Sequence, residues 1–214
     1  MVQVENSTLD ALRAEHGAIK PFRLKDGTIG AVRKCTAEER TAALERMAGS
    51  QNAATWQAQL ALSAMVLPAD LSERQAVLKR YPTLREKLAD FAWDLAEGGS
   101  CQLTPSEVGD LASDLDARSP DGWRCYSLRD GRRVAIRPWT LAEQARFHDK
   151  IGQKGRRRSK AEAIAADELA RSVVIHPTGP QGPALLDEFP CLADTLAWDA
   201  RDIADGGLEE LGEA

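Results

Sequence analysis

The apolar residues of this chain follow two spacings, one of two residues and one of three to four, which predict strands and helices. Near the start, Phe22 and Leu24 alternate with basic residues, as in a half-buried strand. The dipeptide Asp26-Gly27 comes next and is typical of a tight turn, because glycine tolerates positive φ. Residues 29–33 then form the returning strand, so a β-hairpin is predicted.

Helical patterns flank this hairpin. Residues 7–16 open with a Ser-Thr cap and are followed by Gly17, which predicts a short helix. Thr36 and Glu39 have the spacing of a capping box, which begins a helix that runs to about residue 47. Apolar stripes and helix breakers predict three further helices in this half of the chain, over residues 53–67, 72–80 and 84–95.

The second half of the chain repeats this order. Residues 25–39 align without a gap with residues 129–143, at an offset of 104 (130 − 26). The Gly-Gly pairs that close the two halves align at an offset of 108 (206 − 98). The halves agree on apolar positions and breakers but seldom on exposed polar residues, which indicates a tandem duplication with a shared fold rather than a shared active site.

In the second half, a helix is expected over residues 104–117 and a hairpin from strands at 123–128 and 132–137. The largest departure from the first half is a longer loop between helices, at residues 152–160. The predicted fold is α+β and mostly α-helical. It has two tandem repeats, over residues 1–100 and 101–214, each made of a short helix, a β-hairpin and three to four helices.

Composition supports an ordinary globular protein, because 43% of the 214 residues are hydrophobic and 29% are charged. The formal net charge of −5 gives no support to general nucleic-acid binding. No apolar run reaches the roughly 18–20 residues that a membrane span needs. The first residues lack the basic and apolar regions of a signal peptide, so a cytoplasmic protein is expected.

The sequence shows no motif that carries catalysis. No Gly-rich phosphate loop and no G-x-S-x-G serine context is present, and the carboxylates lie on helix faces among basic neighbours. The histidines and cysteines have no metal-binding spacing. They are His16, His148 and His176, and Cys35, Cys101, Cys125 and Cys191. We therefore expect no enzyme, no catalytic or metal residues, no cofactor, and four independent reduced thiols.

Two features are candidates for a partner surface. Arg156, Arg157, Arg158 and Lys160 form the only concentrated positive charge. They could bind phosphates or an acidic protein surface. Alternatively, they could form a solvated loop that has no counterpart in the first half. Trp198 aligns with Asp90, so it could anchor a partner at the surface or pack against the other repeat.

The segments that carry a family resemblance are residues 135–140 (Ala-Ile-Arg-Pro-Trp-Thr), 174–177 (Val-Ile-His-Pro) and the helix that begins after Phe189-Pro190. Together with the short helix and hairpin before them, they resemble the tail assembly chaperone-like proteins of tailed bacteriophages and prophages. The resemblance covers nearly the whole chain, although the duplication departs from the usual single unit. The shared motifs set the fold, so no functional residue carries over.

The resemblance implies a non-enzymatic factor in the host cytoplasm that binds the long helical tape-measure protein or the tail-tube subunit before tail assembly. The first alternative is a structural virion component, such as a tail or connector protein, that stays in the finished particle. The second is a small nucleic-acid-binding regulator that acts through Arg156 to Lys160. The sequence leaves the oligomeric state and the binding face open.

Overall fold

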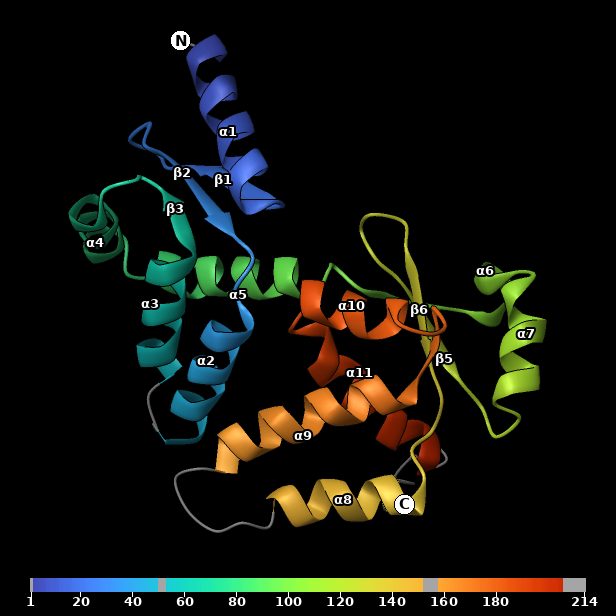
Figure 1. The fold of residues 1–214 in the computed structure, drawn as a ribbon. Coiled ribbons are helices and arrows are strands. Elements are labelled where there is room, and N and C mark those ends of the chain that lie inside the picture. The colour runs from blue at the N-terminus through green and yellow to red at the C-terminus, as the bar shows by residue number, and fades with distance from the viewer. Residues whose placement is uncertain (1, 50–52, 152–157, 206–214) are drawn as a thin grey trace, which may run out of the picture. The chain divides into compact units, whose positions relative to one another are not determined.

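The computed structural model describes residues 2–49, 53–151 and 158–205 (Figure 1). The chain divides into two compact units, Met1–Glu97 and Gly98–Ala214. The sequence placed this boundary after residue 100. Gly98 belongs with the second unit because its carbonyl accepts a hydrogen bond of 2.9 Å from the backbone N–H of Arg129.

The first unit contains one small antiparallel sheet of order β1-β2-β3, with helices before and after it. The predicted hairpin is present, with Phe22 opposite Gly30 and Arg23 opposite Ile29. Its elements are α1 (Val2–His16), β1 (Ile19–Arg23), β2 (Ile29–Arg33), α2 (Ala37–Gly49), α3 (Ala53–Ala64), β3 (Met65–Leu67), α4 (Leu71–Arg80) and α5 (Leu84–Ala96).

The second unit has an antiparallel sheet of order β4-β5-β6-β7. The second predicted hairpin is β5-β6, with Tyr126 opposite Val134. The elements are β4 (Cys101–Leu103), α6 (Pro105–Val108), α7 (Leu111–Arg118), β5 (Arg124–Ser127), β6 (Arg133–Ile136), α8 (Leu141–Ile151), α9 (Arg158–Val173), β7 (Val174–His176), α10 (Gln181–Glu188) and α11 (Leu192–Ala204). The fold is therefore α+β and mostly helical, with two small antiparallel sheets.

The predicted helix over residues 53–67 is wrong at its end. Helix α3 stops at Ala64, and the next three residues form β3, in which Met65 pairs with Val32 and Leu67 with Ala31. A proline disfavours helical geometry in the residue before it, and Pro68 follows Leu67 directly. The second unit shows the same change, because α9 gives way to β7 before Pro177.

The predicted helix over residues 104–117 is also wrong, because it is two helices. Thr104 and Glu107 form a capping box at the start of α6. Gly109 then adopts a φ of 63°, a left-handed value that ends a helix, and α7 begins two residues later. Strand β4, which precedes α6, was not expected at all.

Strand β4 has no counterpart beside β1 among the described residues of the first unit. In the second unit, Leu103 of β4 pairs with Cys125 of β5. The residue of β1 that aligns with Cys125 is Pro21 (125 − 104). Proline has no N–H to donate to a further strand, so Pro21 protects this edge of the sheet from pairing.

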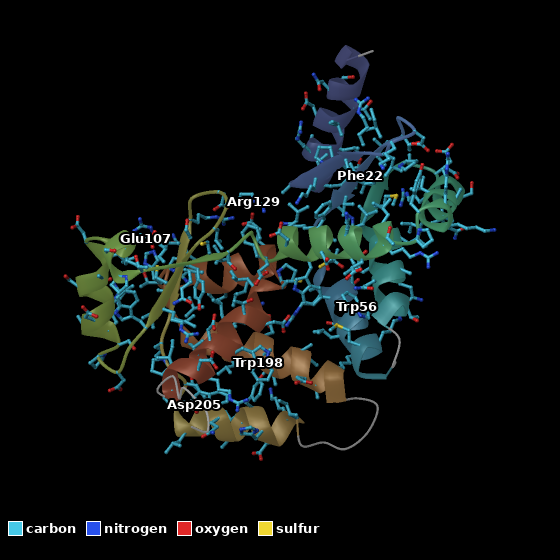
Figure 2. The ribbon with its side chains drawn as sticks, turned by 180° about the vertical axis from the view of Figure 1, so that it is seen from behind. Phe22, Trp56, Glu107, Arg129, Trp198 and Asp205 are labelled. Atoms are coloured by element: carbon cyan, nitrogen blue, oxygen red, sulfur yellow. The ribbon has the colours of Figure 1, made fainter. Side chains whose placement is uncertain are left out.

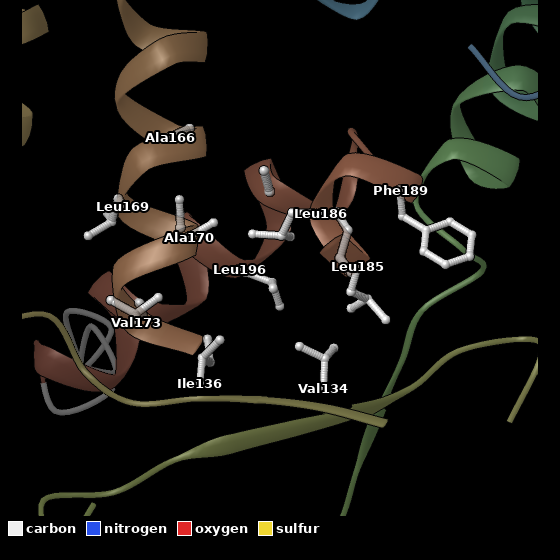
Figure 3. Packing of buried hydrophobic residues seen from close by; sticks show 14 of the residues in the cluster. Val134, Ile136, Ala166, Leu169, Ala170, Val173, Leu185, Leu186, Phe189 and Leu196 are labelled. Atoms are coloured by element: carbon white, nitrogen blue, oxygen red, sulfur yellow. The ribbon is translucent and has the colours of Figure 1, made fainter. Parts of the chain in front are cut away.

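The main core of the second unit lies between β6 and the last three helices. Figure 3 shows Val134 and Ile136 pointing toward Val173, Leu185 and Leu196. The other face of the same sheet packs against α6 and α7 through a smaller cluster. That cluster contains Cys125, Ala135, Val108 and Leu115. Both faces of this sheet are therefore covered, because successive side chains of a strand point to opposite faces.

The core of the first unit is formed by β2, β3 and helices α2, α3 and α5. Many of its side chains are alanines, which let these helices approach closely. Its buried residues include Ala31, Val32, Ala43, Leu60, Ala61, Ala64, Met65, Leu88, Ala89 and Ala92. Among the described residues, no helix has both the length and the apolar character that crossing a membrane requires.

Candidate functional site

A partly buried ion pair connects strand β2 to helices α2 and α3 in the first unit. Arg33 is the last residue of β2, and its two amino groups each donate a hydrogen bond of 2.8 Å to the carboxylate of Glu39. Arg33 also donates to the carbonyl of Ser63 in α3, at 3.2 Å. Glu39 in turn accepts from the backbone N–H of Thr36, at 2.9 Å. Glu39 therefore both caps α2 and binds Arg33. Arg33 in turn connects the sheet to α3.

The second unit contains the same arrangement. Arg137 donates hydrogen bonds of 2.9 and 2.7 Å to Glu143, and a further one of 3.1 Å to the carbonyl of Ser172. Glu143 accepts from the backbone N–H of Thr140, at 2.8 Å. Both predicted capping boxes are confirmed, since the Thr36 and Thr140 hydroxyls also accept from the N–H groups of the two glutamates.

These glutamates stay ionised at neutral pH. Hydrogen bonds from Arg137 lower the pKa of Glu143 from its ordinary value of 4.5 to about 2. Burial of Glu39 acts to raise its pKa, but hydrogen bonds from Arg33 and Thr36 outweigh burial, so the pKa lies below its usual value. A carboxylate of this kind is a poor proton donor or acceptor near pH 7. The two pairs act as structural ties.

A groove runs between two helices beside each of these ion pairs. In the first unit it lies between α2 and α3 and has a volume of about 280 Å³, and in the second it lies between α8 and α9 and has a volume of about 80 Å³. The first is lined by Glu39, Ala42, Ala43, Arg46, Trp56, Gln59, Leu60 and Ser63. The second is lined by Glu143, Arg146, Phe147, Lys150, Ala165, Glu168, Leu169 and Ser172.

Each of the eight residues that line the first groove aligns with a residue that lines the second. The offset is 104 on the first helix (143 − 39) and 109 on the second (172 − 63). Large and small side chains exchange places across the helix pair. The first groove has Ala43 on α2 and Trp56 on α3, whereas the second has Phe147 on α8 and Ala165 on α9. Such an exchange keeps the total side-chain volume similar while it moves the aromatic ring from one helix to the other.

Trp198 lies beside the second groove, on α11 (Figure 2). Its ring is edge-on to Phe147 at 6.2 Å, and the guanidinium of Arg201 lies 5.7 Å from the ring centroid. The residue is still 44% exposed. Trp198 therefore packs within its own unit and keeps an apolar surface, and its use as a partner anchor stays a prediction.

The basic segment is only partly within the described residues. Arg156 and Arg157 lie outside them. Arg158 begins α9, and Lys160 lies exposed in the first turn of that helix. The prediction that this segment contacts phosphates or an acidic protein surface therefore stays a prediction.

The described histidines take part in local packing. His148 is edge-on to Trp139 and Phe147, at 6.1 and 6.0 Å. Partial burial lowers the pKa of His176. Within residues 2–49, 53–151 and 158–205, no three His, Cys, Asp or Glu side chains gather as a metal site, and the four cysteines form no disulfide bond.

One polar cluster connects the sheet of the second unit to α11. Arg124 donates to Asp199 at 2.6 Å, and the Tyr126 hydroxyl donates to the other carboxylate oxygen of Asp199. Burial and this hydrogen bond raise the pKa of Tyr126 above its usual range, so the phenol is neutral at pH 7. The cluster fixes the last helix against β5 and presents no activated nucleophile.

Sequence reasoning missed the role of Arg33 and Arg137. The alignment places them opposite each other, but each glutamate six residues later was assigned only a capping role. The recurrence of an Arg and a Glu six residues apart in both units is the signal that could have revealed the ion pairs. Comparisons with protein-family models, with curated proteins and with solved structures found no match to this chain.

Proposed function

We propose that this protein is a non-enzymatic tail assembly factor of a tailed bacteriophage or prophage, acting as a chaperone in the host cytoplasm. Its partner is the tape-measure protein or the tail-tube subunit. The proposal rests on the resemblance of the motifs around residues 135–140 and 174–177, and on one structural observation that supports protein binding. That observation is the pair of matching helix grooves, in which aromatic and aliphatic side chains lie beside charged ones.

The proposal includes a duplication, in which the two units are copies of one module. Several backbone hydrogen bonds recur at aligned positions and support it. The N–H of Cys35 donates to Ala92 at 3.2 Å, and the N–H of Trp139, 104 residues later, donates to Ala200 at 3.3 Å. Both sheets also shift register at the same place, between Ala31 and Val32 and between the two residues aligned with them in β6.

Grooves between helices suit helical partners. An amphipathic helix can lay its apolar face into such a groove, where that face is removed from water. The tape-measure protein of the resembled family is long and helical, and its exposed apolar stripes would aggregate without cover. Two copies of one groove on one chain would let a single chaperone bind two stretches of the partner and gain affinity from the linkage.

A tagged pull-down from phage-producing or prophage-induced cells tests this function, with mass spectrometry of the eluate and of purified particles. The chaperone proposal expects the tape-measure or tail-tube protein in the eluate and no copy of this protein in particles. Stoichiometric presence in particles would instead favour the structural virion component. Recovery of nucleic acid without tail proteins would favour a regulator that uses Arg156 to Lys160.

A further inference from the structure

The two matching helix grooves share the sign of their charge. Each has one glutamate, Glu39 or Glu143, whose carboxylate is neutralised by an arginine of the adjoining strand through two hydrogen bonds. The other charged residue among the described lining of the first groove is Arg46, on α2. Since Arg33 already balances Glu39, this lining carries net positive charge.

The second groove is also positive, through cations of α8. Arg146 and Lys150 are four residues apart, so both lie on the face of α8 that borders the groove. Lys150 forms an ion pair with Glu168 of α9, and Arg146 supplies positive charge beyond that pair. Lys150 aligns with Arg46 (150 − 104). A cation at this position is therefore common to the two grooves.

The surface beside the second groove continues along α9. Ile164 lies one turn before Glu168, and Lys160 lies one turn before Ile164, so the three share one face of the helix. Ile164 is 45% exposed, and Lys160 is exposed as well. An apolar side chain in water next to a further cation favours a partner that supplies both apolar contacts and negative charge.

The shape of the second groove favours a protein over a nucleic acid. Its apolar residues Phe147, Ala165 and Leu169 are all buried, so they form the floor of the groove. Binding of single-stranded nucleic acid uses aromatic faces that are open to stacking by bases, and a buried ring offers none. The apolar stripe of a helix can instead lie along such a floor, with its flanking side chains at the rim.

We propose that both grooves bind amphipathic helices of a protein partner in which glutamate or aspartate flanks the apolar stripe. The carboxylates contact Arg46 in the first groove, and Arg146 and Lys160 in the second. This inference deepens the proposed function and rests on it in one respect, namely that the partner is a helical protein. Charge complementarity selects an acidic helix over a basic one, although the chain as a whole has a net charge of −5.

Two synthetic peptides provide the test. Each is a helical peptide of about 18 residues, or five turns, with the same leucine stripe. Glutamate flanks the stripe in one peptide and arginine in the other, and each carries a fluorophore for anisotropy titration. The glutamate peptide is expected to bind the full-length protein at least about tenfold more tightly than the arginine peptide. Because both titrations use the unaltered protein, this comparison does not depend on how any variant folds.

A charge-reversal variant locates the binding sites. Arg46→Glu with Arg146→Glu changes one exposed cation in each groove and is expected to weaken binding of the glutamate peptide at least about tenfold. The control is Lys79→Glu with Lys87→Glu, which makes the same change in net charge at two exposed positions that line neither groove. This control is expected to keep the affinity within about twofold. Circular dichroism melts establish that both variants are folded.

Equal affinity for the two peptides, or equal losses in the two charge-reversal variants, would overturn the inference. Tighter binding of a fluorescent single-stranded oligonucleotide than of the glutamate peptide would also overturn it, in favour of nucleic acid. The fate of the proposed function is read separately, from the pull-down. Tail proteins recovered equally by the Arg46→Glu, Arg146→Glu variant would reject the charge preference and leave the assembly function standing. Selective binding of the glutamate peptide without recovery of any tail protein would keep the grooves and reject the assembly function.

Discussion

The ion pair between Arg137 and Glu143 makes the most direct prediction about stability. Replacing Glu143 with glutamine removes the charge but keeps an oxygen that can accept from the Thr140 N–H, so the capping box is largely retained. The change leaves Arg137 partly buried without its anionic partner, since the two side chains are only 26% and 12% exposed. A partly buried charge without a partner is costly.

The expected magnitude follows from the pKa of Glu143, which is lowered from 4.5 to about 2. Each pKa unit corresponds to about 1.4 kcal/mol, so the charged form is favoured by up to about 3 kcal/mol in the folded protein. Water reaches the exposed quarter of Arg137 and screens part of this interaction. We therefore expect Glu143→Gln to lower the free energy of unfolding by about 2 kcal/mol.

Urea unfolding at pH 7, followed by circular dichroism and tryptophan fluorescence, measures this change. The two compact units can unfold in separate transitions, so each transition is fitted by itself. Asp10→Asn is the control, because Asp10 pairs with Arg13 on α1 with side chains 70% and 50% exposed, and such pairs contribute about 0–1 kcal/mol. A loss for Glu143→Gln no larger than that for Asp10→Asn would refute the reasoning.

Three further predictions follow from the same structure. The pKa of Glu143 is lower in the folded chain than in the unfolded one. The stability that its charge contributes is therefore present above about pH 4.5 and is lost as the pH falls toward 2. Over this range, the urea midpoint of the native protein should fall more steeply than the midpoint of Glu143→Gln. A Cβ at Gly30 would lie 2.1 Å from the ring of Phe22, so Gly30→Ala should lower the free energy of unfolding by about 1–3 kcal/mol in the same assay. Phe147→Ala should cost about 3–5 kcal/mol, and adding Ala165→Trp should restore part of it, as in the first groove; no recovery would contradict the proposed exchange of side-chain volume.

The hairpins and the helix starts could be predicted because their signals are local. Asp26-Gly27 and Asp130-Gly131 form the turns, and the side chain of Asp26 accepts from the N–H of Thr28 at 3.0 Å. The threonine and glutamate of each capping box are three residues apart. In these cases, the residues that decide the structure lie within a few positions of each other.

Strands β3, β4 and β7 could not be predicted because tertiary pairing decides them. Leu67 continues the apolar stripe of α3, and although Pro68 disfavours a helix there, the strand depends on pairing with β2, more than 30 residues earlier. Residues 101–103 (Cys-Gln-Leu) are too few for their alternation to identify a strand, and β4 forms where β5 offers an edge. The break at Gly109 was overlooked because a single glycine is tolerated within many helices.

The candidate grooves could not be predicted from the sequence, because they too depend on tertiary packing. Periodicity placed Trp56 and Leu60 on one apolar face of a helix, but it does not show that Leu60 is buried while Trp56 stays partly exposed and lines a groove.

The measurement that tests the central proposal most directly is the solubility of the tape-measure protein of the same phage or prophage. It would be produced alone and together with this protein, and quantified in the soluble fraction after centrifugation. A chaperone should move most of the tape-measure protein into the soluble fraction. If the native protein leaves the tape-measure protein as insoluble as it is alone, the chaperone account is contradicted.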